Sequence, residues 1–185
     1  MEENLPKNNW FLPAIAFGFI LLVSFLFIAG SPTTKPQTKT TSKQTTSSVE
    51  KGSVDLALSP EKLDLKVGVK TTAQININST AEVSAVEIHL TFDPKVVTIK
   101  DVAPLEFFDN PRILKKEISN EKGEITFAIG GLPEKSGSGQ LAQISLTAKG
   151  AGVTNLEFSQ TSQAAVIGKN TNALGKKSGT IINVN

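Results

Sequence analysis

The chain has 185 residues, which suffices for one domain with appended segments. It contains no cysteine and one histidine, which excludes disulfides, thiolate metal sites and multi-histidine metal centres. The formal net charge is only +2, and residues 52–185 balance 14 basic against 14 acidic side chains. Without a dense basic patch, nucleic acid is not a predicted partner.

A long apolar segment follows a short polar tail of residues 1–9. Residues 10–30 carry no charge, and at about 1.5 Å rise per residue about 20 of them cross a hydrocarbon core about 30 Å thick. Trp10 suits the interfacial aromatic belt. The run is longer than the core of a cleaved signal peptide, and its best small pair, Ala29 and Ser31, precedes a proline. We therefore predict an uncleaved, single-pass transmembrane helix.

The next segment, residues 31–52, is rich in Ser, Thr, Lys and Pro. It cannot bury enough apolar surface to offset its ordering entropy, which predicts a disordered linker. Lys7 and the amino terminus lie on one side of the apolar segment, and Lys35, Lys39 and Lys43 lie on the other. The positive-inside rule by itself would therefore place the C-terminal part in the cytoplasm, but this rule is weak for long translocated domains, and the linker indicates the opposite orientation. A tether is most useful between a membrane and an exposed module. We therefore expect a cytoplasmic N-terminus and an extracellular C-terminal domain, residues 53–185.

Short alternating runs separated by turn residues begin at residue 53. In the clearest run, residues 85–92, apolar side chains alternate with Glu87, His89 and Thr91, which predicts a half-buried strand. Nine to eleven short strands without an amphipathic helix predict an antiparallel β-sandwich, with loops at 104–111 and 130–139. The expected strands are 54–58, 62–67, 72–78, 85–92, 95–102, 113–119, 124–130, 140–149, 153–159, 164–168 and 179–184.

A corner formed by Phe92, Asp93 and Pro94 follows the clearest strand. Proline cannot donate to a strand ladder, and an aspartate here caps a turn through its own neighbouring backbone. We expect these three residues to determine the fold. If this stretch contributes to binding, the outward row of Glu87, His89 and Thr91 is its candidate partner-binding face.

Catalytic chemistry is not indicated. Glycoside hydrolysis needs two facing carboxylates, and Asp93, Asp101, Glu106 and Asp109 are close in sequence. The pattern places no pair of them in an apolar pocket. A calcium site built from loop carboxylates and carbonyls stays an alternative. We predict no enzyme, no catalytic residue, no cofactor and no metal centre.

Aromatic residues bear on carbohydrate binding, because flat polysaccharide surfaces are held by exposed rings. Five of the ten phenylalanines lie in residues 10–30. In the C-terminal domain, only Phe107 and Phe108 are expected on a loop, and one of the two is expected to pack inward. A planar aromatic platform is therefore disfavoured, while a groove for a single glycan chain stays open.

Four stretches together resemble a cohesin domain: LKVGVKTTAQININ (65–78), AVEIHLTFDPKVVTI (85–99), GEITFAIGGLP with GSGQLAQISLTAKGAGVTNLEF (123–158), and GTIINV (179–184). Phe92 stands where tyrosine is common in that family. The resemblance implies a nine-stranded jelly-roll β-sandwich without enzymatic activity. It also implies a dockerin, a calcium-loaded helical module, as the partner held against one sheet face. Because this chain has no dockerin-type calcium loop, the dockerin must belong to another protein.

The sequence thus predicts a membrane-anchored, surface-displayed module that holds a dockerin-bearing or other protein partner, in polysaccharide degradation or at the cell surface. Two alternatives remain. One is a carbohydrate-binding β-sandwich. The other is a structural surface or pilus-like protein, although Leu5-Pro6 after Glu2-Glu3 does not match the start of a pilin.

Overall fold

The computed structural model describes residues 52–185; the predicted tail, the predicted membrane anchor and all but the last residue of the predicted linker lie outside the described residues. Within the described part, no helix has the length and apolarity needed to cross a membrane. This part is built from ten strands: β1 (Val54–Ser59), β2 (Lys62–Leu65), β3 (Lys70–Thr91), β4 (Val97–Pro104), β5 (Pro111–Ser119), β6 (Glu124–Ala148), β7 (Gly152–Phe158), β8 (Gln163–Val166), β9 (Leu174–Ser178) and β10 (Thr180–Val184).

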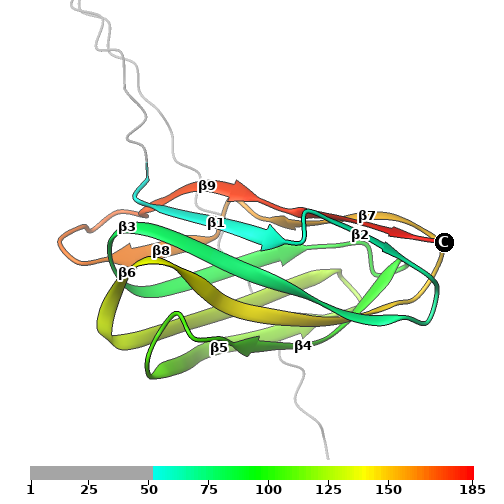
Figure 1. Ribbon diagram of the computed structural model, residues 1–185, viewed down its shortest axis with the longest axis horizontal. Helices are drawn as coiled ribbons and strands as arrows, with labels where there is room; N and C mark the ends of the chain where they lie inside the picture. Colours follow the sequence, from blue (N-terminus) through cyan, green and yellow to red (C-terminus); the bar gives the residue numbers. More distant parts are fainter. Residues whose placement is uncertain (1–51) are drawn as a thin grey trace, which may run out of the picture. The chain divides into compact units, whose positions relative to one another are not determined.

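The strands form two layers that lie one behind the other in Figure 1. One layer contains β9, β1, the first part of β3, the second part of β6, and β4. The other contains β8, the second part of β3, the first part of β6, and β5. A short ladder of β2, β10 and β7 joins the end of β3.

The two longest strands contribute to both layers, which corrects the expected loop at 130–139. Residues 72–78 and 85–92 belong to one strand, β3, and residues 124–130 and 140–149 belong to β6. The strands stay paired through the Gly-rich stretch, where Ser79 faces Gly137 and Val83 faces Lys135. Register shifts at this point let both strands bend, and Figure 1 shows them curving at the same end of the domain.

The expected antiparallel sandwich of nine strands is corrected in two respects. Residues 52–185 form ten strands, and two of the strand pairings are parallel. β1 pairs with β9, and β2 pairs with β10, in parallel; the remaining pairings are antiparallel. Strand β9 had no sequence signal, because its residues LGKKS lack the alternation that marks a half-buried strand.

The core lies between the layers and is made by the inward positions of the alternating strands. Its largest fully buried side chains come from β1, β3, β4, β6 and the loop before β5. They are Phe108, Phe127, Leu56, Leu58, Ile75, Ile77, Ile88, Leu90, Ile99, Ile125, Ile129 and Leu141. The domain of about 130 residues therefore has an ample apolar core without disulfides.

The Phe92-Asp93-Pro94 corner ends β3 and starts the turn into β4. The Asp93 carboxylate accepts a hydrogen bond from the Lys95 N–H at 2.8 Å, while the Asp93 N–H donates to the Thr154 hydroxyl at 2.7 Å. Phe92 is buried and donates its N–H to the Gly123 carbonyl at 2.9 Å. Gly123 has φ +73°, and a Cβ there would lie 2.1 Å from the Phe92 oxygen, so only glycine fits this close approach.

Candidate partner-binding face

The outer surface of the β8–β3–β6–β5 layer carries the sequence-predicted row and is the candidate site. Strand register sets four rows of outward side chains across it. Small side chains dominate one end, and acidic and hydroxyl side chains dominate the other. The rows are Ala165, Ala85, Gly130 and Arg112; Gln163, Glu87, Ala128 and Lys115; His89, Thr126 and Glu117; and Thr91, Glu124 and Ser119.

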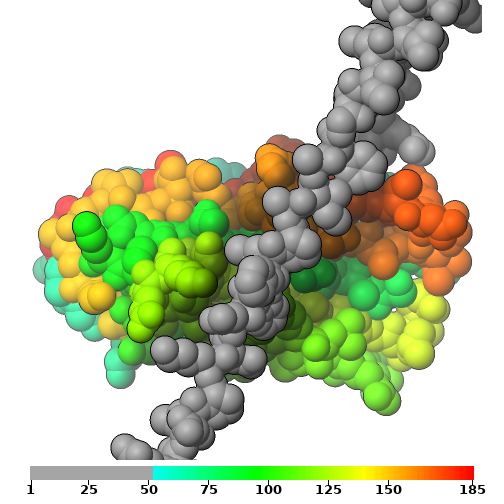
Figure 2. Space-filling view, turned by 180° about the vertical axis from the view of Figure 1, so that it is seen from behind, coloured from blue at the N-terminus to red at the C-terminus, as the bar shows by residue number. Residues whose placement is uncertain are grey.

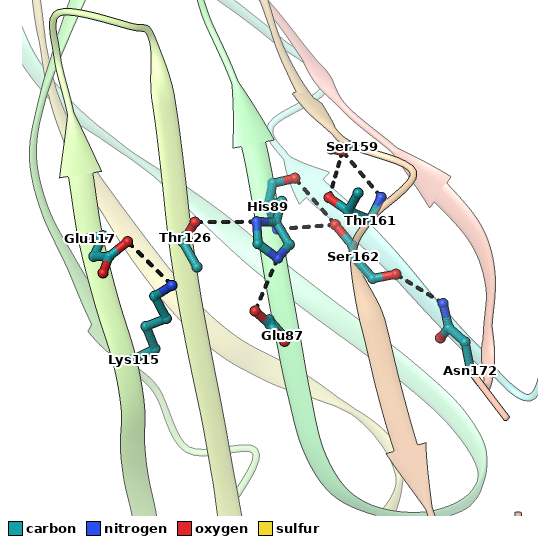
Figure 3. A network of polar contacts seen from close by, with 9 residues as sticks. All are labelled: Glu87, His89, Lys115, Glu117, Thr126, Ser159, Thr161, Ser162 and Asn172. Atoms are coloured by element: carbon teal, nitrogen blue, oxygen red, sulfur yellow. Dashed lines mark hydrogen bonds and ion pairs between the residues drawn. The ribbon is translucent and has the colours of Figure 1, made fainter. Parts of the chain in front are cut away.

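His89 stands at the centre of a polar network on this face (Figure 3). Its Nε2 lies 3.1 Å from the Glu87 carboxylate, one pleat along the same strand. Its Nδ1 lies 3.2 Å from the Thr126 hydroxyl on the neighbouring strand. On β5, Lys115 and Glu117 form an ion pair at 3.3 Å. Because the imidazole is held from two sides, its position on the face is defined.

Strand β8 is attached to the other side of His89 by side chains as well as by backbone pairing. The buried Ser162 hydroxyl accepts a hydrogen bond from the His89 N–H at 3.1 Å and donates to the His89 carbonyl at 3.2 Å. Asn172 donates to the Ser162 carbonyl and accepts from the Ala164 N–H, both at 3.0 Å. These contacts fix the segment that forms one border of the face.

An apolar-floored depression of about 350 Å³ occupies the small-residue end. Ala85, Ala128 and Leu114 contribute to its lining, and Leu114 is 63% exposed. The register shift between Ile113 and Lys115 places Leu114 in a bulge of the edge strand. The segment after β8, including Lys169, forms a further wall, and Figure 2 shows this orange-red segment projecting at the end of the domain.

A second, polar depression of about 160 Å³ lies at the other end of the face. It is lined by His89, Thr91, Glu124 and Thr126, and by hydroxyls of the β7–β8 connection. Among the described residues, the Glu124 carboxylate has no hydrogen-bond or ion-pair partner, whereas Glu87 and Glu117 are paired. The face therefore combines a largely apolar recess with a polar one that contains the unpaired Glu124 carboxylate.

The structure brings Glu87, His89 and Thr91 together on one solvent-facing surface, as the alternation of the strand predicts. Sequence reasoning missed Ala128 and Leu114. Ala128 looks like any outward alanine until its cross-strand neighbours are known. Leu114 could have been suspected only because it is an apolar residue next to Lys115 and Lys116 in a strand without clear alternation.

The four carboxylates considered for catalysis do not converge. Asp93 caps its corner, Asp101 binds Lys116 at 2.8 Å, and Asp109 binds Lys135 at 2.7 Å. Glu106 is exposed in the loop between β4 and β5. Residues 52–185 contain no cluster of three or more side chains suited to hold a metal ion.

The outer surface of the opposite layer bears on the carbohydrate alternative. It has a groove of about 510 Å³ whose lining includes Asn76, Asn78, Ser138 and Gln140. No aromatic side chain lines this groove. Phe107 and Phe108 are both buried, at 2% and 1% exposure, and pack edge to face with centroids 5.0 Å apart. The expectation that one of them could project is therefore corrected, because both fill space between the layers.

Comparisons with known proteins agree with this architecture. The family model described as "Cohesin domain" matches residues 56–184. No curated protein matches the sequence. Among solved structures, the seventh ScaB type I cohesin from Pseudobacteroides cellulosolvens is 18% identical with a TM-score of 0.58, covering 71% of this chain and 92% of its own.

Two further structures widen the comparison. A non-cellulosomal cohesin from the archaeon Archaeoglobus fulgidus is 15% identical with a TM-score of 0.61, covering 72% of this chain and 92% of its own. A type I cohesin–dockerin complex from Clostridium thermocellum is 15% identical with a TM-score of 0.58, covering 71% of this chain and 94% of that one. At such identities, the likeness establishes the fold.

Proposed function

Because the chain belongs to the cohesin domain family, we propose that residues 53–185 form a protein-binding module that holds a dockerin-bearing partner. The resemblance of the sequence and the solved cohesin–dockerin complex both support this partner class. We further propose that residues 10–30 anchor the module in a membrane and that it faces outward, in a polysaccharide-degradation or cell-surface context. The length of the apolar segment and the composition of residues 31–52 support this location.

The observation that carries the proposal is the open four-stranded face with its apolar depression. A partner helix can insert an aliphatic side chain between Ala85, Ala128 and Leu114, where burial from water supplies affinity. The polar network around His89 borders this recess and supplies hydrogen-bonding groups that can set specificity. This pairing of an apolar centre with a polar border is the usual anatomy of a protein interface.

The test is binding of fragment 52–185 to a panel of purified, calcium-loaded dockerins by isothermal titration calorimetry. We expect at least one dockerin to bind in calcium and to be released by a chelator. Ala128→Arg fills the apolar depression and should weaken binding by about 100-fold or more. Asn76→Arg on the opposite layer is the matched control and should leave binding unchanged. If the whole panel fails to bind, or if the two variants behave alike, the proposal is wrong.

A further inference from the structure

We propose that the groove on the outer surface of the β9–β1–β3–β6–β4 layer binds a neutral oligosaccharide, whose hydroxyl groups form hydrogen bonds with side-chain amides. This inference is independent of the partner proposed above, because it concerns the layer opposite the candidate partner-binding face. The groove of about 510 Å³ falls within the size range of small-molecule sites and is larger than either depression on the other layer.

A small side chain in a row of polar ones creates this groove. Ala57 of β1 faces outward between Ser178 of β9 and Asn76 of β3. Figure 1 shows β1 lying between these two strands. Leu56 and Ile77 also line the groove, but their side chains are buried in the core, so they contribute backbone to its floor. Ala57 is therefore a shallow point that is bordered by polar side chains.

Side-chain amides of β3 and β6 supply the hydrogen-bonding groups. The Gln140 amide donates to the Gln74 side-chain oxygen at 3.0 Å, and the Ser138 hydroxyl donates to the Asn78 side-chain oxygen at 2.8 Å. In the described part of the chain, the Asn76 side chain and the Asn78 NH₂ group have no hydrogen-bond partner. An amide both donates and accepts, as a sugar hydroxyl does, so neighbouring hydroxyls of one sugar ring can satisfy an amide.

The charges of the lining favour an uncharged ligand. Of the described residues that line the groove, only Asp55 and Lys176 are charged, and their formal charges cancel. The Asp55 carboxylate accepts a hydrogen bond from the Lys176 backbone N–H at 2.7 Å, which holds it at the border with β9. A glycan of uronic acids or a phosphorylated glycan would bring negative charge towards this carboxylate without meeting a net positive charge. A neutral glycan meets no such repulsion.

The uncharged polar surface continues beyond the groove along β3 and β6. The outward residues of this strip, paired across the two strands, are Thr72 with Ser145, Gln74 with Gln143, Asn76 with Gln140, and Asn78 with Ser138. The strip from residue 72 to residue 78 is about 20 Å long at the rise of a strand. This length suits a linear chain of several sugar rings better than a single sugar.

Other ligand classes match this surface less well. An extended peptide usually pairs with the backbone of an edge strand or inserts apolar side chains into pockets. Beneath the groove, β1 and β3 are paired on both sides, and Ala57 is the one outward apolar side chain in the described lining. The flat face of a crystalline polysaccharide requires aromatic rings, which this lining lacks. A single oligosaccharide chain is therefore the favoured ligand.

Titration of ¹⁵N-labelled fragment 52–185, followed by NMR, tests the inference. The neutral probes are linear hexasaccharides of glucose, mannose, xylose and N-acetylglucosamine, and the charged probe is a hexagalacturonate. The side-chain NH₂ signals of Asn76 and Asn78 report contact with a ligand directly. The fragment has its own core, and the solved cohesins that are matched over 92% of their own length are folded modules.

We expect at least one neutral hexasaccharide to shift these NH₂ signals and the Ala57 amide signal, with a Kd on the order of 1 mM, because no ring stacking adds to the hydrogen bonds. The hexagalacturonate should bind at least about fivefold more weakly. Asn76→Asp removes the amide donors and adds a negative charge, and should weaken binding by about fivefold or more. Asn155→Asp makes the same change at an exposed site on β7 outside the groove and should leave binding unchanged.

Ala57→Gln keeps the surface neutral but fills the floor of the groove, and should weaken binding at least as much as Asn76→Asp. If none of the neutral hexasaccharides shifts the two NH₂ signals, or if Asn76→Asp and Asn155→Asp bind alike, the inference is wrong. If an uncharged Gly/Ser peptide shifts these signals and no glycan does, the groove is a peptide site and the inference is also overturned. The dockerin panel is read separately, so failure of either kind of binding leaves the other conclusion intact.

Discussion

Ser162 shows how one buried hydroxyl positions the candidate face. It has 0% exposure, and its oxygen exchanges hydrogen bonds with both the N–H and the carbonyl of His89. It thereby continues the pairing between β8 and β3 beyond the residues whose backbones pair directly. The His89 carbonyl also accepts a hydrogen bond from the Ser159 N–H at 2.8 Å. Loss of the Ser162 hydroxyl would therefore leave the carbonyl with this second donor, whereas the His89 N–H would lose its acceptor.

Replacing Ser162 by alanine should lower the free energy of unfolding by about 1–3 kcal/mol, because the His89 N–H loses its acceptor in a buried position. Urea denaturation followed by fluorescence of an attached dye or by circular dichroism measures the change. Thr161→Ala, at an exposed neighbouring site, should stay within about 0.5 kcal/mol of the parent. A Ser162→Ala variant as stable as Thr161→Ala would show that backbone pairing alone holds β8.

Residue-level prediction succeeded where the signal was local. The alternation of residues 85–92 places Glu87, His89 and Thr91 outward without knowledge of any neighbour. Ser162 could not be found in this way, because its partner His89 is 73 positions away. The same limit applies to Glu124, whose role depends on which strand lies beside β6.

At the scale of elements, an inward-pointing lysine closes the open edge between β5 and β4. Lys116 reaches from β5 to the Asp101 carboxylate at 2.8 Å and to the Val102 carbonyl at 3.3 Å. The hydrogen bond from Lys116 holds the pKa of Asp101 below its ordinary value. Charged side chains in such positions also discourage edge-to-edge association of sheets.

Replacing Asp101 by asparagine should lower stability at pH 7 by less than about 1 kcal/mol, because this pair is largely exposed. A carboxylate whose pKa is lowered by folding stabilises the fold fully when the pH is above its unfolded-state pKa, near 3.9. This contribution is lost as the pH falls through the folded-state pKa. The difference between parent and Asp101→Asn should therefore be smaller at pH 2.5 than at pH 7.

Urea denaturation at pH 7 and at pH 2.5 measures both quantities. Glu61→Gln, which removes an exposed carboxylate from the β1–β2 turn, is the control for the loss of one negative charge at the surface. A difference that persists unchanged at pH 2.5 would mean that Asp101 acts through packing rather than through its charge.

Element prediction was most reliable for strands with one buried face and least reliable where backbone pairing alone forms the strand. β1, β4, β7 and β10 bury alternate residues and were expected near their observed positions. The Gly-rich middle of β6 reads as a loop, since glycine and serine favour turns. It is a strand because its backbone pairs with that of β3. This pairing joins residues that are far apart in the chain, so the local sequence pattern cannot reveal it.

For the whole molecule, fold class was predictable because one core collects nearly all the alternating runs, and the order of motifs indicated the family. The partner-binding surface was only partly predictable. It depends on charges and small side chains that four strands bring together from residues 85 to 165. No local pattern encodes such an arrangement, and several different sequences could present equivalent surfaces on the same sandwich.

The proposed membrane anchoring concerns the whole chain, and protease shaving of intact cells tests it. If residues 10–30 span the membrane with the C-terminal domain outside, a protease added externally should cut within residues 31–51. An immunoblot should then detect a fragment close to 52–185 in the supernatant, because the paired strands of the domain resist cleavage that a Ser/Thr/Lys-rich linker permits.

A cytoplasmic marker protein should stay intact in the same samples, which controls for lysis. A variant with the linker lysines Lys35, Lys39, Lys43 and Lys51 changed to glutamine should resist trypsin while staying sensitive to a protease of broad specificity. That pair of results places the cut in the linker.

Full-length protein that survives on intact cells but is cut after lysis would instead place the C-terminal domain on the cytoplasmic side. Surface display of the partner would then be excluded, because an external partner could not reach the β8–β3–β6–β5 face.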